Sequence, residues 1–276
     1  MRGLAHILFL IYFLLIPLEA RPLVFAPLPY SHKEDLFEDF SPMLRYLEQT
    51  LHTSITFRYE SKYNHLIEAF VQNKIDIAYL GPLPLRILME EFPDALPLVS
   101  FNEKNGKPNY RCVLIKFPED TIDASKPKTI TVALTQPLST CGYFMSDILL
   151  NSSLHLPLKK VQYRYVNSHD EVALSVIRGD YLLGGMKESL AQEYYSLGLR
   201  IFAYSDFVPG FALVINTQTV SPEQINAIKQ ALLSAPSSVY STWGTSISHG
   251  MSDARKEDYL RLDIKKLSEI PQKGNF

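Results

Sequence analysis

The chain has 276 residues, of which 46% are hydrophobic, and its 27 Lys and Arg side chains nearly balance 29 Asp and Glu side chains, for a formal net charge of −2. This balance excludes a protein that binds nucleic acid through its overall charge, and the hydrophobic content is that of a folded globular chain. The two cysteines, Cys112 and Cys141, form no CxxC pair and no zinc or redox motif. We therefore expect neither a metal site nor a cofactor.

The first twenty residues are typical of a secretory signal peptide. Arg2 gives a positive start, residues 7–18 are apolar, and Ala20 offers a small residue at the cut. The apolar run is too short to span a bilayer comfortably. Leu18 is not ideal at the third position before the cut, so an uncleaved anchor is the alternative. Cleavage would leave 256 residues (276 − 20), enough for two lobes, with no membrane insertion afterwards.

Strand and helix patterns then alternate along the chain. Short β-branched or apolar runs predict strands, and apolar residues at spacings of three and four predict helices. Alternation of this kind indicates a parallel sheet with helices on both faces, whose ligands bind beyond the carboxyl ends of the strands. The predicted strands cover residues 23–26, 55–59 and 75–80, and the helices cover 37–51, the stretch that Ser61 caps, and the stretch after Pro82.

Residues 98–101 and 110–117 are predicted strands around an Asn105-Gly106 turn, which is typical of a hairpin. The polar segment 118–128 holds two prolines and is interpreted as the crossing into a second lobe. We therefore predict a first lobe over residues 21–117, a second lobe over 118–208, and a return to the first lobe with C-terminal helices over 209–276.

The second lobe repeats the strand–helix pattern. Ser168 and Glu171 form a capping box, so His169 lies in the first turn of a helix. Ser221 and Gln224 form another box on the return, and residues 255–267 predict one more helix. The predicted strands cover residues 129–133, 161–165, 181–184 and 199–203, with a returning strand over 209–215.

The stretch Pro137–Tyr143 joins the predicted strand at 129–133 to a helix. Ser139 is a natural N-cap and Thr140 adds a hydroxyl. Unpaired backbone N–H groups and the positive end of the helix dipole would suit an oxyanion here. On this stretch alone, an ordinary capped helix without a ligand is the simpler interpretation, and the oxyanion site is the alternative. Two secreted α/β lobes joined by two crossings are, however, the architecture of a periplasmic binding protein.

Four segments carry a resemblance to one family. They are Lys74–Pro82 (KIDIAYLGP), Pro137–Tyr143 (PLSTCGY), Ser168–Asp170 (SHD) and Val208–Gly210 (VPG). In this order and spacing they resemble the periplasmic phosphate/phosphite/phosphonate-binding proteins of ABC importers, over essentially the whole chain after residue 20. The resemblance implies a two-lobed, type II Venus-flytrap α/β fold, each lobe being a mostly parallel sheet flanked by helices. It also implies a non-enzymatic, monomeric protein of the periplasm that passes a small oxyanion to an ABC permease.

The resemblance further implies which residues hold the oxyanion. Carried over by motif, Ser139, Thr140, Tyr63 and His169 donate hydrogen bonds to it, a role that hydroxyl and imidazole groups suit. Cys141 replaces the second serine of the family's motif and is a poor donor. Tyr79 is adjacent to Leu80, where aminophosphonate binders often carry a tyrosine. The predicted ligand-binding residues are thus Tyr63, Tyr79, Ser139, Thr140, Cys141 and His169.

A further departure concerns the ligand. Aminophosphonate binders carry an acidic residue after Pro-Gly, where this chain has Phe211. Its loss argues against an alkylamine group on the ligand, and Glu188 is the nearest remaining candidate for such a contact. We expect a more apolar cleft than in those relatives.

Two other functions fit the same residues. A periplasmic sensor could present an oxyanion or a metalloid to a membrane sensor kinase, or an enzyme could use Cys141 as nucleophile and His169 as base. The enzyme lacks a third group to orient His169. Cys112 and Cys141 could be free thiols, a disulfide or a soft-ion pair. We expect free thiols, because a disulfide between a lobe and the hinge would restrict closure.

Overall fold

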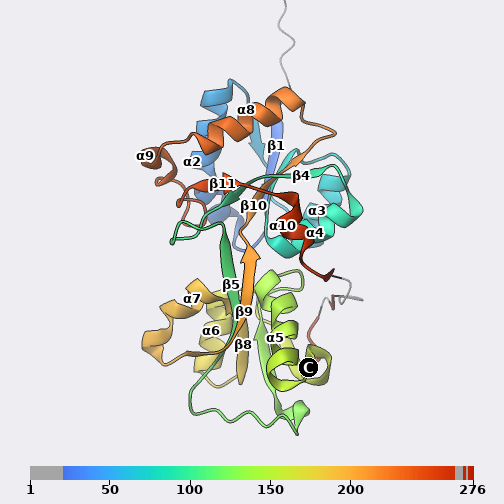
Figure 1. The fold of residues 1–276 in the computed structure, drawn as a ribbon, viewed down its shortest axis with the longest axis vertical. Helices are drawn as coiled ribbons and strands as arrows, with labels where there is room; N and C mark the ends of the chain where they lie inside the picture. The colour runs from blue at the N-terminus through green and yellow to red at the C-terminus, as the bar shows by residue number, and fades with distance from the viewer. Residues whose placement is uncertain (1–20, 265–269, 272) are drawn as a thin grey trace, which may run out of the picture.

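The computed structural model describes residues 21–264, 270–271 and 273–276. The predicted signal segment lies outside these residues. The chain folds into two α/β lobes, one above the other in Figure 1, that are joined by neighbouring crossings. None of the helices in the described ranges is both long enough and apolar enough to cross a membrane.

Lobe 1 is built on a six-stranded sheet with the order β11-β4-β10-β3-β1-β2. Strands β2, β1 and β3 run parallel, as the alternating pattern predicts, and β10, β4 and β11 add antiparallel pairs, so the sheet is mixed. The strands are β1 (Leu23–Pro27), β2 (Ile55–Phe57), β3 (Ile77–Leu80), β4 (Ala95–Phe101), β10 (Ala212–Asn216) and β11 (Met251–Asp253).

Helices cover both faces of this sheet. One apolar core lies under α2 and α8, and the other lies under α3, α4 and α10. Burial of these two faces is the main stabilising contribution to the lobe. The bounds are α2 (Lys33–Leu51), α3 (Tyr63–Val71), α4 (Pro82–Glu91), α8 (Pro222–Leu233), α9 (Ser237–Tyr240) and α10 (Lys256–Leu260).

Lobe 2 is built on a five-stranded sheet with the order β7-β6-β8-β5-β9. It is parallel over β7, β6 and β8 and antiparallel over β5 and β9. One face packs against α5 and the other against α6 and α7 (Figure 1). The elements are β5 (Asn109–Lys116), η1 (Pro127–Thr129), β6 (Thr131–Leu134), a π-helical turn η2 (Thr140–Phe144), α5 (Met145–Leu154), η3 (Leu158–Lys160), β7 (Gln162–Tyr165), α6 (His169–Ile177), β8 (Leu183–Lys187), α7 (Glu188–Glu193), η4 (Tyr195–Leu197) and β9 (Arg200–Pro209).

The expected hairpin between residues 98–101 and 110–117 is wrong. The first of these strands lies in the lobe 1 sheet as β4, and the second lies in the lobe 2 sheet as β5, between β8 and β9. The Asn105-Gly106 turn does form, since Glu103 N–H donates to Lys107 O at 2.9 Å and Gly106 has a φ of 75°. It reverses the chain only locally, so the first crossing lies at residues 102–108 and not at 118–128. The second crossing follows Pro209, where β9 gives way to β10.

Three of the four predicted helix caps form. Ser139, Ser168 and Ser221 each accept a hydrogen bond from the N–H three residues on, and Ser221 also has the reciprocal bond of a capping box. The cap predicted at Ser61 is wrong, because α3 begins one residue later and Lys62, which precedes it, makes no side-chain cap bond. Of the helix predicted over 255–267, α10 is observed, and residues 265–269 are outside the described ranges.

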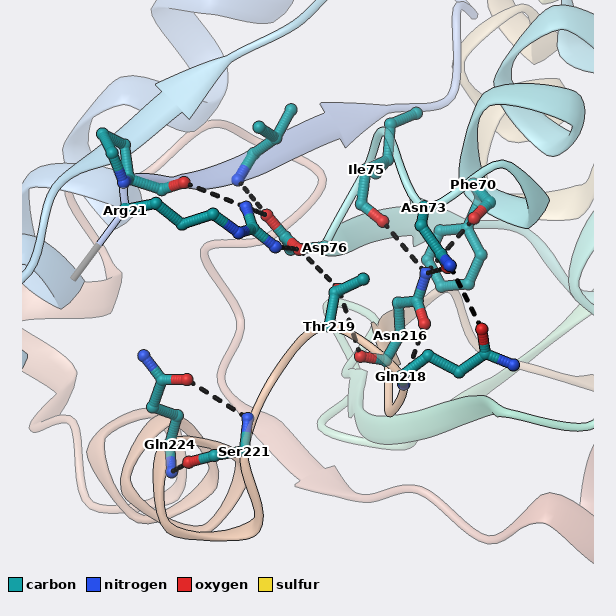
Figure 2. A network of polar contacts seen from close by, with 12 residues as sticks. Arg21, Phe70, Asn73, Ile75, Asp76, Asn216, Gln218, Thr219, Ser221 and Gln224 are labelled. Carbon is teal, nitrogen blue, oxygen red and sulfur yellow. Dashed lines mark hydrogen bonds and ion pairs between the residues drawn. The ribbon is translucent and has the colours of Figure 1, made fainter.

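A polar network closes the end of lobe 1 that faces away from lobe 2 (Figure 2). The Asp76 carboxylate, only 1% exposed, accepts from the Arg21 guanidinium at 2.6 and 2.8 Å, from Val24 N–H at 2.7 Å and from the Thr219 hydroxyl at 2.5 Å. Burial raises the pKa of Asp76, but these donors outweigh it and hold the pKa below its ordinary value. The network ties the starts of β1 and β3 to the end of β10, where Asn216 donates to Phe70 O.

The last described residues return to lobe 2 and lie along its edge strand β7. Asn275 N–H donates to Tyr163 O at 3.0 Å, and its side chain accepts from Tyr163 N–H and donates to Val161 O, both at 2.8 Å. Arg164 donates to Phe276 O at 2.6 and 2.9 Å. Part of the outer edge of β7, at Tyr163, is thereby paired.

Candidate ligand-binding site

A cavity of about 330 Å³ lies between the lobes, at the ends of the strands where the sequence predicts a ligand. Both lobes and both crossings supply its wall. The structure brings all six predicted ligand-binding residues to this wall; that they contact a ligand stays a prediction. They are Tyr63, Tyr79, Ser139, Thr140, Cys141 and His169.

The start of the helical segment η2–α5 forms part of the lobe 2 wall. Ser139 Oγ accepts from Gly142 N–H at 3.0 Å, so its own proton is free to be donated. The N–H groups of Thr140 and Cys141 have no acceptor among the described residues. A Cβ at Gly142 would lie 1.9 Å from Thr135 Oγ1, so only glycine lets the turn pack this closely on the end of β6. Free donors at a helix start suit an anion.

Thr140 has a second role that the sequence did not indicate. Its hydroxyl oxygen accepts from Leu83 N–H at 3.0 Å, in a buried contact between η2 of lobe 2 and α4 of lobe 1. The hydroxyl thus joins the two lobes, and it also has a side-chain hydrogen bond with Tyr110. A ligand bound to Thr140 would lie directly at the contact between the lobes.

Cys141 forms a disulfide with Cys112, with 5.0 Å between their Cα atoms. The expectation of free thiols is therefore wrong. Because β5 belongs to the lobe 2 sheet, Cys112 and Cys141 lie in the same lobe. The restriction of lobe closure that we expected from a disulfide therefore does not arise. It ties the η2 turn to β5. A disulfide sulfur supplies no thiolate, so neither a Cys141 nucleophile nor a soft-ion pair of thiols is available.

His169 is the first residue of α6, whose N-terminus Ser168 caps at 3.1 Å. Its Nδ1 is buried and has no hydrogen-bond partner among the described residues. Burial and the neighbouring Lys187 ammonium lower the pKa of His169 to about 4, although the Asp170 carboxylate acts in the opposite direction. The imidazole is consequently neutral at pH 7, and His169, which lines the cavity, carries a polar atom without a partner among the described residues.

Lys187 is a wall residue that the sequence interpretation missed. Its ammonium pairs with the Glu103 carboxylate at 2.7 Å and lies 4.9 Å from the centre of the Tyr110 ring. Lys187 ends β8, whose carboxyl end faces the cavity. The predicted strand ended three residues too early, at Gly184. Had it been extended, the rule that ligands bind beyond strand ends would have indicated Lys187.

Aromatic rings line the side of the cavity nearest the crossings. Phe211 stacks on Tyr79 with ring centres 5.2 Å apart and on Tyr110 at 6.1 Å. Burial raises the pKa of Tyr63 and of Tyr79 well above that of free tyrosine, so both phenols stay protonated and can donate. This wall agrees with the apolar cleft expected from Phe211.

Buried polar atoms without partners concentrate in the residues of this cavity wall. Of the eight such side-chain atoms within the described ranges, four belong to residues that line it: Thr135 Oγ1, Gln136 Oε1, His169 Nδ1 and His249 Nε2. Native proteins rarely leave such atoms unsatisfied, so this concentration indicates a place that a ligand completes. Glu188, by contrast, does not line the cavity and accepts from Gln192 at 3.3 Å.

Comparison with known proteins agrees with this geometry. Residues 25–259 match the family model described as "ABC transporter, phosphonate, periplasmic substrate-binding protein". The phosphate-import protein PhnD of Mycolicibacterium smegmatis is 22% identical over 221 residues, which are 74% of this chain and 68% of that protein.

Two solved structures share the fold. A binding protein component of an ABC phosphonate transporter from Pseudomonas aeruginosa has a TM-score of 0.73 and 19% identity, covering 90% of this chain and 86% of that one. PhnD1 from Prochlorococcus marinus, solved with methylphosphonate, has a TM-score of 0.74 and 14% identity, covering 89% and 97%. These relatives bind substrates for transport and are not enzymes. The chain belongs to the family of periplasmic substrate-binding proteins of phosphonate ABC transporters.

Proposed function

We propose that the protein binds a phosphoryl-type oxyanion (phosphate, phosphite or a phosphonate) between its lobes and delivers it to the permease of an ABC importer. The observation that carries the proposal is the lobe 2 wall. Free N–H groups at the start of η2, the unpartnered Nδ1 of His169 and the Lys187 ammonium line one cavity. Such charge-assisted and backbone donors suit a tetrahedral anion.

A thermal-shift screen tests the ligand class. The protein, after export and cleavage near Ala20, is heated with phosphate, phosphite, methylphosphonate, sulfate and arsenate. A tight ligand raises the midpoint by mass action. A phosphorus oxyanion that gives the largest shift supports the proposal, and no shift with any of them contradicts it.

Ser139→Ala tests the position of the site. Loss of a hydroxyl donor to a charged group should weaken binding by about 1.5–3 kcal/mol. The substitution also removes a helix cap, which costs about 0.5–2 kcal/mol of stability. Ser221→Ala is the matched control, because Ser221 caps α8 in the same way and does not line the cavity. Both variants should lose stability, and only Ser139→Ala should lose affinity. Equal affinity in both would place the anion elsewhere.

Delivery to a permease is the second half of the proposal, and membership of a transporter family supports it over a sensor role. Cells that lack the protein should lose uptake of the identified ligand, and the wild-type gene should restore it. Unchanged uptake together with a lost transcriptional response would favour a sensor kinase as the partner. The protein is proposed to work as a monomer in the periplasm.

A further inference from the structure

The lobe 1 side of the cavity holds a polar group that the oxyanion does not explain. Asp39, on α2, lines the cavity, and its carboxylate has no hydrogen bond or ion pair among the described residues. Burial, together with the like charges of Asp35 and Glu38, raises its pKa.

The other charged side chains of the wall are paired. Lys187 lies 2.7 Å from Glu103, and Lys104 lies 4.0 Å from Glu193. Both pairs are composed of residues that line the cavity. Within the described part of the chain, Asp39 is thus the carboxylate of this wall that lacks a cationic partner. A half-buried carboxylate in a cleft favours a donor from the ligand.

The backbone around Asp39 is held in place by packing and hydrogen bonds. Gly244 N–H donates to Asp39 O at 3.0 Å, and a Cβ at Gly244 would lie 2.5 Å from Asp39 Oδ1. The loop around Gly244 is anchored on either side by Trp243 and Ile247, which are buried in the lobe 1 core. Asp39 therefore lies against a fixed backbone.

Other polar groups face the same part of the cavity. Tyr30 and Ser246 share a hydrogen bond of 3.1 Å between their hydroxyl oxygens, and the charge of Asp39 contributes to the raised pKa of Tyr30. His249 Nε2 is buried and has no partner among the described residues. This unpartnered nitrogen is an observation independent of Asp39, and it also calls for a ligand group.

We infer that Asp39, with Ser246 and His249, forms a second subsite for an organic substituent that carries a hydrogen-bond donor, a hydroxyl or an ammonium group. The inference rests on the proposed function, since the oxyanion end of the same ligand binds lobe 2. The residues that line the cavity come from α2 and α4 of lobe 1 and from η2 and α7 of lobe 2. A cavity of about 330 Å³ is of the size that accommodates an organic ligand.

Three phosphonates with tails of equal size test the subsite: butylphosphonate, 3-hydroxypropylphosphonate and 3-aminopropylphosphonate. They share one anionic head and differ only in a terminal methyl, hydroxyl or ammonium group. Calorimetry with the wild-type protein should show at least one donor-bearing tail binding about tenfold or more tightly than the butyl tail. The preferred donor then identifies the ligand class. Homologues one carbon shorter and longer cover the tail length.

Asp39→Asn should remove this preference and leave the affinity for methylphosphonate unchanged. Glu34→Gln is the matched control, since Glu34 is an exposed acid of the same helix that does not line the cavity. It should leave both affinities unchanged. If all three tails bind wild type equally, or if Asp39→Asn keeps the preference, the subsite is refuted while oxyanion binding stands. If no phosphonate binds at all, the proposed function itself fails.

Discussion

The Asp76 network and the interlobe cavity differ in whether their buried polar atoms have hydrogen-bond partners. Each oxygen of the Asp76 carboxylate has at least two donors, from a guanidinium, a backbone N–H and a hydroxyl. In the cavity, Thr135, Gln136, His169 and His249 each keep a buried atom without a partner among the described residues. Both sets of polar groups lie near the ends of strands. Only the Asp76 network has all its hydrogen-bond partners within the described residues.

This difference distinguishes polar groups that stabilise the fold from polar groups that are available to a ligand. A complete network lowers the free energy of the fold and offers nothing to a ligand, whereas incomplete groups cost stability and gain their partners only when a ligand binds. Asp76 belongs to a motif that resembles the family's, yet its role is to fasten strands. The comparison predicts that substitutions at one place change stability, and at the other, affinity.

Asp76→Ala should have the largest effect on stability. It removes the carboxylate that holds Arg21, Val24 and Thr219. Loss of the acceptor for Val24 N–H and for the Thr219 hydroxyl should cost about 1–3 kcal/mol each, whereas the half-exposed Arg21 guanidinium is solvated and adds little. Ligand affinity should not change. Denaturant unfolding and calorimetry measure the two quantities. Asp180→Ala is the control, because Asp180 pairs with Arg178 at the surface and should cost less than about 1 kcal/mol.

Loss of the disulfide should come next. Replacing Cys112 and Cys141 by serine should destabilise the protein by roughly 3–4 kcal/mol, the value expected for a loop of the 29-residue separation between them. Because the bond ties the η2 turn to β5, affinity should also fall, although less than stability. Thiol titration of the denatured, unreduced protein should find no free thiols. Two titratable thiols would show that the disulfide does not form, and the predicted loss of stability would then not be expected.

Lys187 should matter for affinity. The double variant Lys187→Met, Glu103→Gln removes the cation without leaving its partner's charge unpaired, and it should weaken oxyanion binding by about 1.5–3 kcal/mol with little change in stability. Lys229→Met with Asp253→Asn is the control, since this ion pair lies outside the cavity wall. An affinity equal to wild type in the first variant would mean that the anion does not reach Lys187.

His169 should give the smallest effect at neutral pH, because its contribution develops only in acid. Because its folded-state pKa, about 4, lies below the unfolded value of about 6.5, the unfolded chain takes up the proton first. Stability should therefore fall as the pH is lowered from about 6.5 toward 4, by up to about 3 kcal/mol at pH 4. His169→Asn should remove this part of the pH dependence of unfolding. A variant with the wild-type pH profile would show that His169 titrates normally.

The sequence predicted the lobes well because their signals are local. The apolar spacing of α2 and the serine caps at Ser139, Ser168 and Ser221 are set within one turn of helix, and the structure contains them. The assignment of β5 failed for the opposite reason. The apolar pattern of β5 would suit a strand of either sheet. The Asn105-Gly106 turn carries no information about which sheet the next strand joins.

The same limit explains the errors at the site. The disulfide follows from the position of β5, so placing Cys112 near the hinge also produced the wrong expectation about free thiols. Lys187, Asp39 and His249 belong to no motif that resembles the family's, and they reach the cavity only through tertiary structure. Motif residues such as Ser139 could be predicted, whereas residues that distinguish this cavity from its relatives could not.

The pairing of Asn275 with β7 has a consequence for the behaviour of the protein in concentrated solution. Edge strands with open N–H and C=O groups are templates for association between molecules. Here the side chain and backbone of Asn275 occupy the groups that Tyr163 and Val161 would otherwise expose. The last residues thus cover part of the β7 edge. We expect a chain without residues 273–276 to keep both lobes and to associate more readily at high concentration than the full chain does.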